Sequence, residues 1–196
     1  PDRADAFGMR ESGRLAAFVA QLGALLERIE LHERSERSAR AQRQLAKIER
    51  LLLSTDGVEA FFPLLAGLLL DSELLPLHRV GLLRVGPDRP TLVLHGREGR
   101  DPDLEAACAA SGLLDPATDS GLAGQVGGPT PSIRTDLAGD PAWAPFLPDA
   151  EAAAVFPLRR GGEAWGAIVC TAVEPGAFGP EAIAWFGQLV SALEIA

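Results

Sequence analysis

AAAVFPLRRGGEAWGAIVCTAV, residues 152–173, is the part of the chain from which a fold can be built. It contains two apolar runs separated by Arg160-Gly161-Gly162, and both runs are rich in residues that favour strands. The paired glycines supply the positive φ angles that a tight hairpin needs. Each run is apolar on successive residues, not on alternate ones, which indicates that both faces are covered. The sequence therefore predicts an antiparallel strand pair at the centre of a sheet, with helices on both sides.

Pro157 and Gly166 interrupt this pattern, one in each run. Proline cannot donate to a strand ladder, so Pro157 is expected where its nitrogen faces away from a partner strand or where the strand changes partner. Gly166 has no side chain, which indicates that another group comes close to it. We expect that group to be a helix packed on the sheet, with a ligand as the alternative.

The first fifty residues predict a long helical segment. Residues 11–53 contain no proline, contain no glycine after Gly23, and are rich in helix-forming residues. Apolar residues recur at alternating spacings of three and four, a pattern typical of a coiled coil or helix bundle. This seam consists of Leu15, Phe18, Leu22, Leu25 and Ile29, lapses over His32–Gln44, and resumes out of phase at Leu45, Ile48 and Leu52. The shift in phase indicates either one helix with a stutter or two helices in line.

The remaining elements alternate between helices and strands. We expect residues 1–54 to form a helical dimerisation segment and residues 55–196 to form an α+β domain. The alanine-rich stretch Leu104–Leu114 favours a short helix, although strand pairing could override that preference. The other expected elements are a helix over 58–74, strands over 78–85 and 91–95, a short helix over 121–126, a strand over 132–135, a turn-rich crossover over 136–146 and a helix over 180–196.

Composition excludes several function classes. The chain has 196 residues, 47% of them apolar, and a net charge of −9, whereas a nucleic-acid-binding face is basic. We therefore expect no nucleic-acid partner. The longest apolar run is too short to span a membrane, and the N-terminus does not have the pattern of a signal peptide. These features predict a cytoplasmic protein that does not enter the membrane.

We find no set of residues that predicts catalysis. The motifs of serine hydrolases, phosphate-binding loops and zinc peptidases do not occur in the sequence. Cys108 and Cys170 are expected to be small buried hydrophobic residues instead of nucleophiles. His32, His78 and His95 are scattered along the chain, so we expect no metal or haem site. The sequence-based expectation is a domain that is not an enzyme.

Four local patterns, in this order, resemble a GAF domain, the small-molecule-binding module of signalling proteins. They are Ser120-Gly121-Leu122-Ala123-Gly124-Gln125-Val126, then Ile133 with Asp136 and Asp140-Pro141, then Val155-Phe156-Pro157-Leu158 with Gly166-Ala167-Ile168, and finally Phe178 before the last helix. The resemblance covers residues 56–196. It implies an antiparallel sheet with terminal helices on one face, which commonly pack against a second copy, and a crossover that roofs a pocket on the other face.

The resemblance also restricts the cofactor. The chain has no Asn, so the Asn-Lys-Phe-Asp-Glu motif of cyclic-nucleotide-binding members is missing. Neither cysteine is followed by His, as in many bilin-binding members, and two cysteines are fewer than the methionine-sulfoxide-reducing members use. We therefore expect no known cofactor of the family. If the pocket exists, its predicted ligand-binding residues are Ile133, Asp136, Trp143, Phe146, Phe156, Ile168 and Cys170.

These observations predict a non-catalytic sensor or regulatory domain of a bacterial signalling protein. It would bind a small molecule or a partner and transmit the signal through dimeric terminal helices to an output domain. The expected homodimer contacts are Leu15–Ile29, Leu45–Leu52 and the C-terminal helix. The alternative is a ligand-free scaffold for dimerisation or protein interaction, in which Trp143 and Phe146 fill the space that a ligand would occupy.

Overall fold

The computed structural model describes residues 9–72, 75–86, 89–115, 121–128, 130–146 and 149–195. The helices are α1 (Met9–Ser54), α2 (Val58–Leu70), α3 (Pro102–Ala110), α4 (Leu122–Val126), the 3-10 helix η2 (Pro141–Phe146) and α5 (Pro180–Ile195). The strands are β1 (Leu77–Arg84), β2 (Thr91–Gly96), β3 (Gly99–Arg100), β4 (Ser132–Arg134), β5 (Ala152–Arg160) and β6 (Glu163–Ala172). They form one sheet in the order β3-β2-β1-β6-β5-β4, in which neighbouring strands are antiparallel.

The predicted central hairpin is confirmed. β5 and β6 pair from Ala152 opposite Ala172 to Arg160 opposite Glu163, and each has another strand on its far side. Gly161 and Gly162 form the turn with φ angles of 60° and 87°. Pro157 lies beyond the point where β4 pairs with β5, so the missing N–H removes no bond from that ladder.

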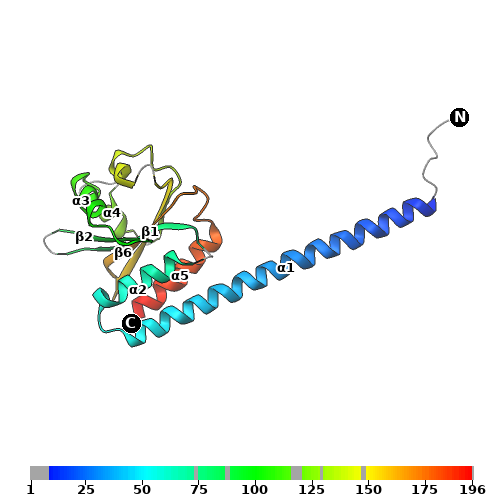
Figure 1. Ribbon diagram of the computed structural model, residues 1–196, viewed down its shortest axis with the longest axis horizontal. Coiled ribbons are helices and arrows are strands. Elements are labelled where there is room, and N and C mark those ends of the chain that lie inside the picture. Colours follow the sequence, from blue (N-terminus) through cyan, green and yellow to red (C-terminus); the bar gives the residue numbers. More distant parts are fainter. Residues whose placement is uncertain are drawn as a thin grey trace. The chain divides into compact units, whose positions relative to one another are not determined.

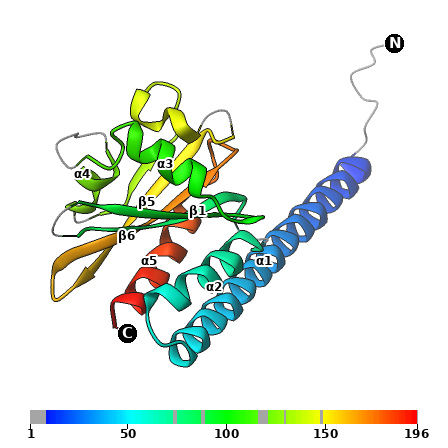
Figure 2. The same ribbon diagram turned by 60° about the vertical axis from the view of Figure 1, so that its left-hand side comes forward.

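Helices cover both faces of the sheet, as predicted. α2 and α5 lie on one face, and α3, α4 and η2 lie on the other (Figures 1 and 2). The continuous apolar runs of β5 and β6 are explained by this arrangement, because successive side chains of a strand point to opposite faces. Val155 packs among the buried residues under α4 and η2, while Phe156 stacks on Phe186 of α5. The fold is therefore α+β, with a covered antiparallel sheet after a long first helix.

The long N-terminal segment is one continuous helix, which resolves the alternative between one helix and two. The chain divides into two compact units, residues 1–42 and 43–196, so the last turns of α1 belong to the second unit. Within that unit Ile48 is fully buried. The Gln44 side chain donates to the Leu68 carbonyl and accepts from the Ser72 hydroxyl, each at 2.8 Å. The second part of the seam is thus out of phase with the first because it faces α2.

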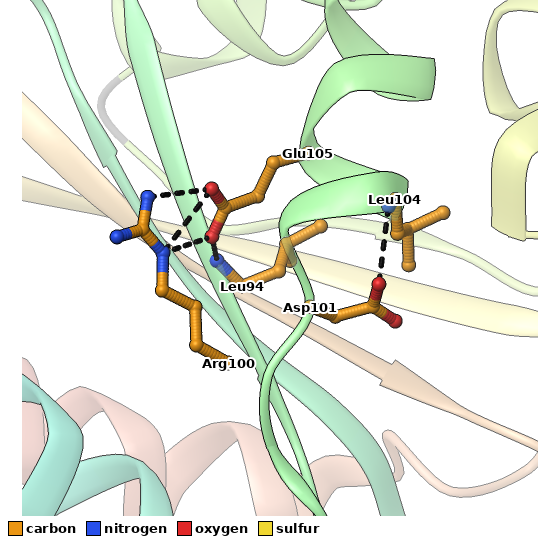
Figure 3. Close-up of polar contacts among 5 residues, drawn as sticks. All are labelled: Leu94, Arg100, Asp101, Leu104 and Glu105. Atoms are coloured by element: carbon orange, nitrogen blue, oxygen red, sulfur yellow. Dashed lines mark hydrogen bonds and ion pairs between the residues drawn. The ribbon is translucent and has the colours of Figure 1, made fainter.

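The stretch that was ambiguous between helix and strand forms α3, and polar contacts explain where this helix begins (Figure 3). The Asp101 side chain accepts from the Leu104 N–H at 3.1 Å, a standard N-cap. One turn on, the Glu105 carboxylate accepts from Arg100 and from the Leu94 N–H. Burial alone would raise the pKa of Glu105, but these hydrogen bonds lower it below its usual value. Because β3 is only two residues long, Glu105 satisfies an edge N–H that β3 does not reach.

Gly166 lies where the close approach was expected, but the neighbour is not a helix. A Cβ built on Gly166 would collide with the carbonyl oxygen of Leu83 on β1. The expectation of a helix at this position is wrong, because the sheet backbone itself occupies the space.

Thr171 is a buried polar residue whose replacement should stabilise the domain. It is 1% exposed, and its hydroxyl has no hydrogen-bond partner among the described residues. Because an unpaired buried hydroxyl costs free energy, Thr171→Val should raise the free energy of unfolding by about 1 kcal/mol. Urea denaturation measures this change. Thr91→Val, at an exposed strand position, is the control and should have little effect; a lower stability for Thr171→Val would contradict the prediction.

Candidate functional site

The crossover between β4 and β5 is held by its own polar contacts. Arg134 donates to the Asp140 carboxylate at 2.8 Å, and its guanidinium lies 5.8 Å from the centre of the Trp143 ring. The other oxygen of Asp140 accepts from the Ala142 N–H at 3.0 Å. Asp136 is exposed and accepts from the Gly139 N–H at 3.2 Å. The geometry therefore gives Asp136 a turn-stabilising contact within the crossover.

Beneath this crossover the predicted pocket residues form part of a packed core. Trp143 and Phe146 are 0% and 1% exposed, with ring centres 5.5 Å apart. They pack with apolar side chains of the sheet and of the covering helices, among them Leu83, Leu94, Cys108, Leu113, Leu122, Leu137, Val155 and Val169. The two aromatic side chains thus occupy space under the crossover.

The other predicted residues do not join them. Phe156 lies on the opposite face of the sheet, where its ring stacks on Phe186 of α5 at 4.2 Å between centres. Ile168 and Cys170 share that face, because they alternate with Val169 along β6. Ile133, on the edge strand β4, is half-buried. The structure therefore does not place the seven predicted residues in one site, and their role in ligand binding stays a prediction.

A pocket that the sequence analysis missed lies on the α2 and α5 face. We call it the α2–α5 pocket; its volume is about 170 Å³. Its lining comes from the end of α1, the α1–α2 turn, α2, the sheet and the end of α5. The lining residues are Leu52, Thr55, Gly57, Val58, Phe61, Phe62, Leu65, Leu82, Leu158, Trp165, Ile168 and Leu193. Because these residues are scattered along the chain and are mostly ordinary core types, no local pattern announces the pocket.

Both cysteines are buried, as predicted. Burial, together with the nearby Asp101 carboxylate, raises the pKa of the Cys108 thiol to about 12. Burial also raises the pKa of Cys170, which lies in the last third of β6. Since the thiolate is the nucleophilic form of cysteine, neither group is prepared for nucleophilic attack in this conformation.

The polar side chains near β1 link structural elements. Arg79 on β1 contacts Asp101 at 3.4 Å and Asp149 at 3.3 Å, which joins the strand to the start of α3 and to the end of the crossover. Partial burial lowers the pKa of His78 and of His95, so both favour the neutral form. The described part of the chain contains no group of three or more His, Cys, Asp and Glu side chains that could hold a metal ion.

The first unit carries an exposed row of apolar side chains, which we call the α1 apolar surface. Its members are 43% to 61% exposed: Leu15, Phe18, Val19, Leu22, Leu25, Leu26 and Ile29. In the other two predicted dimer segments some residues are buried within the single chain: Ile48 near the end of α1, and Phe186 and Leu189 in α5. The part of these segments in a dimer stays a prediction. Within the described residues, no helix is both long enough and apolar enough to cross a membrane.

Comparison with known proteins gives structural similarity only. No family model matches the sequence, and no curated protein matches it significantly. The fold is similar to that of free methionine-R-sulfoxide reductase (fRMsr) of Staphylococcus aureus in the reduced form: TM-score 0.63, 12% identity, covering 79% of this chain and 93% of that one. For the free methionine-R-sulfoxide reductase from Neisseria meningitidis in complex with its substrate, the TM-score is 0.60 and the identity is 18%, over 79% of this chain and 86% of that one. For the phycoerythrobilin-bound GAF domain of a cyanobacterial phytochrome, the TM-score is 0.59 and the identity is 15%, over 81% of this chain and 94% of that one.

These similarities correct one prediction. The expectation that the chain is not an enzyme, which rested on missing catalytic motifs, is overturned, because structures similar to this one include free methionine-R-sulfoxide reductases. A GAF-like sheet with its helices therefore does not separate binding domains from enzymes. The GAF resemblance itself is confirmed at the level of structure by the phytochrome domain and by GAF domains of phosphoenolpyruvate-protein phosphotransferases. The chain has the fold of a GAF domain, preceded by a long helix.

Proposed function

We propose that this chain is a regulatory GAF-type domain that self-associates through the α1 apolar surface and transmits a binding event along α1. The observation that carries the proposal is the α1 apolar surface itself. Its side chains recur at heptad positions and are about half exposed in the single chain. A contiguous exposed apolar surface of this kind is typical of a protein–protein contact.

Charge placement supports a parallel pair of α1 helices. If Leu15, Leu22 and Ile29 occupy the first position of each heptad, Arg28 and Glu33 occupy the flanking positions that approach each other between parallel partners. Val19 and Leu26 widen the apolar stripe beyond a two-stranded seam, which also suits a helix bundle. A second copy of the chain would provide both an apolar stripe and oppositely charged flanking residues that match those of the first.

The route of the signal follows from the continuity of α1. The helix runs from Met9 to Ser54; in its last turns Ile48 is buried and Gln44 bonds to the Leu68 carbonyl of α2. A ligand that favours one packing of the helices over another would change the rotation or register of the paired α1 segments. The proposal therefore requires two helical arrangements of similar free energy.

Introducing negative charge into the α1 apolar surface tests the proposal. We expect the wild-type chain to sediment as a dimer and the double variant Leu22→Glu/Leu25→Glu to dissociate at least tenfold more readily, because it places four carboxylates in the paired seam. Sedimentation equilibrium measures both constants. Leu53→Glu, also on α1 but 89% exposed in the second unit, is the matched control and should remain dimeric. A wild-type monomer, or a double variant that associates like the wild type, would refute the proposal.

A second candidate function is a dimerisation or protein-interaction scaffold without a small-molecule ligand. The filled space beneath the crossover favours it, since Trp143 and Phe146 are fully buried there. The two candidates share the α1 contact and differ in whether the domain binds a small molecule elsewhere.

A further inference from the structure

We infer that the α2–α5 pocket is a binding site for an uncharged aromatic molecule with a single ring. The inference deepens the proposed function, on which it rests, by naming a ligand class and a site. This site lies on the sheet face opposite the crossover, with Leu82, Leu158 and Ile168 of the sheet among its lining residues.

The size of the pocket sets the size of the ligand. Its volume is about 170 Å³. An apolar protein cavity of roughly 150 Å³ binds benzene, and the α2–α5 pocket has a similar volume but opens to solvent beside the exposed Val58. A six-membered ring with one small substituent therefore fits, whereas a nucleotide or a tetrapyrrole does not.

The lining sets the chemistry of the ligand. Among the described residues that line it there is no Asp, Glu, Lys, Arg or His, and the one hydroxyl among them, that of Thr55, donates to the Leu51 carbonyl at 2.7 Å. A charged ligand would lose its hydration without gaining a partner. Three aromatic side chains, Phe61, Phe62 and Trp165, line the pocket and offer edge or face contacts to another ring.

The position of the pocket connects occupancy to α1. Leu52 lies in the last turns of α1, and Thr55 and Gly57 belong to the turn that leads into α2. Leu193 of α5 lines the pocket as well, so three helices contribute to its wall. The Phe62 ring, which lines the pocket, also packs edge-to-face against the His95 ring, with 5.5 Å between the ring centres.

Toluene is the probe, and nuclear magnetic resonance titration of the whole chain is the measurement. We expect saturable binding with a Kd of about 1 mM or lower and shifts confined to residues around the pocket. Val58→Phe should weaken binding at least tenfold, because Val58 lines the pocket and is exposed enough to accept a larger side chain. Leu64→Phe, an exposed position of the same helix outside the pocket, should bind like the wild type. Phenylacetate, which adds a charged carboxylate to the methyl carbon of toluene, should bind at least tenfold more weakly than toluene.

Three results would overturn the inference: no saturable toluene binding, equal binding to Val58→Phe, or equal binding of phenylacetate. A Val58→Phe variant with an altered molar mass would also overturn it, because the pocket would then be covered by a second copy of the chain. Measuring both toluene binding and the molar mass of the wild-type chain separates this inference from the proposed function. Toluene binding with a wild type that does not dimerise refutes only the proposed function, and a wild-type dimer that does not bind toluene refutes only the pocket.

Discussion

Gly166→Ala should lower the free energy of unfolding by about 3 kcal/mol, the upper range for overpacking a tightly filled interior. The alanine methyl group would meet the carbonyl oxygen of Leu83, which belongs to the neighbouring strand and is part of the sheet backbone. A flexible side chain could rotate away from such a contact, but β1 is fixed between β2 and β6. Relief therefore requires a shift of the central strands, which disturbs packing on both faces of the sheet.

The same substitution at Gly187 is the matched control for Gly166→Ala. Gly187 lies in α5, and apart from its chain neighbours and the helix's own backbone no atom of the described residues lies within 4 Å of a Cβ built at that position, so alanine should raise the stability by about 0.5 to 1 kcal/mol. Urea denaturation of both variants measures the two opposite effects. Equal stabilities for Gly166→Ala and the wild type would show that β1 and β6 are not paired in this register.

Raising the pH above about 9 should destabilise the domain through its two buried thiols. The unfolded chain releases thiol protons near the ordinary pKa of 9.0, whereas the folded chain holds the Cys108 proton up to a pKa of about 12. The pKa of Cys170 is also raised by burial. Above pH 8 the folded state then binds more protons than the unfolded state. The free energy of unfolding is therefore unaffected by the thiols below pH 8 and falls as the pH rises above it. At pH 10 the expected loss is about 1.4 kcal/mol per thiol, or about 3 kcal/mol in total.

The slope of stability against pH distinguishes this effect from a change in packing. Cys108→Ala/Cys170→Ala should have a lower stability at pH 7, because two small cavities form, but a flatter decline between pH 8 and pH 10. Each single variant should remove about half of the difference in slope. Chemical denaturation at a series of pH values measures it, and parallel curves for the double variant and the wild type would contradict the burial of both thiols.

Local patterns predicted most elements of the fold. The apolar runs around Arg160-Gly161-Gly162 identified the central hairpin, because turn glycines and strand-forming residues are short-range signals. Because the apolar residues follow one another without interruption, the sequence does not show which face of the sheet each side chain covers. Val155 and Phe156 are neighbours in a strand and therefore point to opposite faces. Because both faces of the sheet are apolar, the sequence does not tell which of the two side chains points towards the crossover. The predicted ligand-binding residues therefore combined two separate cores.

The apolar seam of α1 shows a second limit. Leu22 and Ile48 occupy similar patterns along one helix, yet Leu22 is 43% exposed and Ile48 is completely buried. Whether a helix face meets its own domain or a partner depends on tertiary contacts, here those of Gln44 with Leu68 and Ser72. The pocket beside the α1–α2 turn is likewise a product of tertiary structure.

Hydrogen exchange of the backbone amides over residues 13–31 tests self-association through α1 most directly. An exposed helical segment without a partner opens readily, so its amides exchange rapidly, whereas a paired helix is protected by the free energy of association. We expect strong protection of residues 13–31 that increases with protein concentration and disappears in Leu22→Glu/Leu25→Glu, while the protection of β5 and β6 stays unchanged. Rapid exchange of residues 13–31 at every concentration of the wild-type chain would contradict the account.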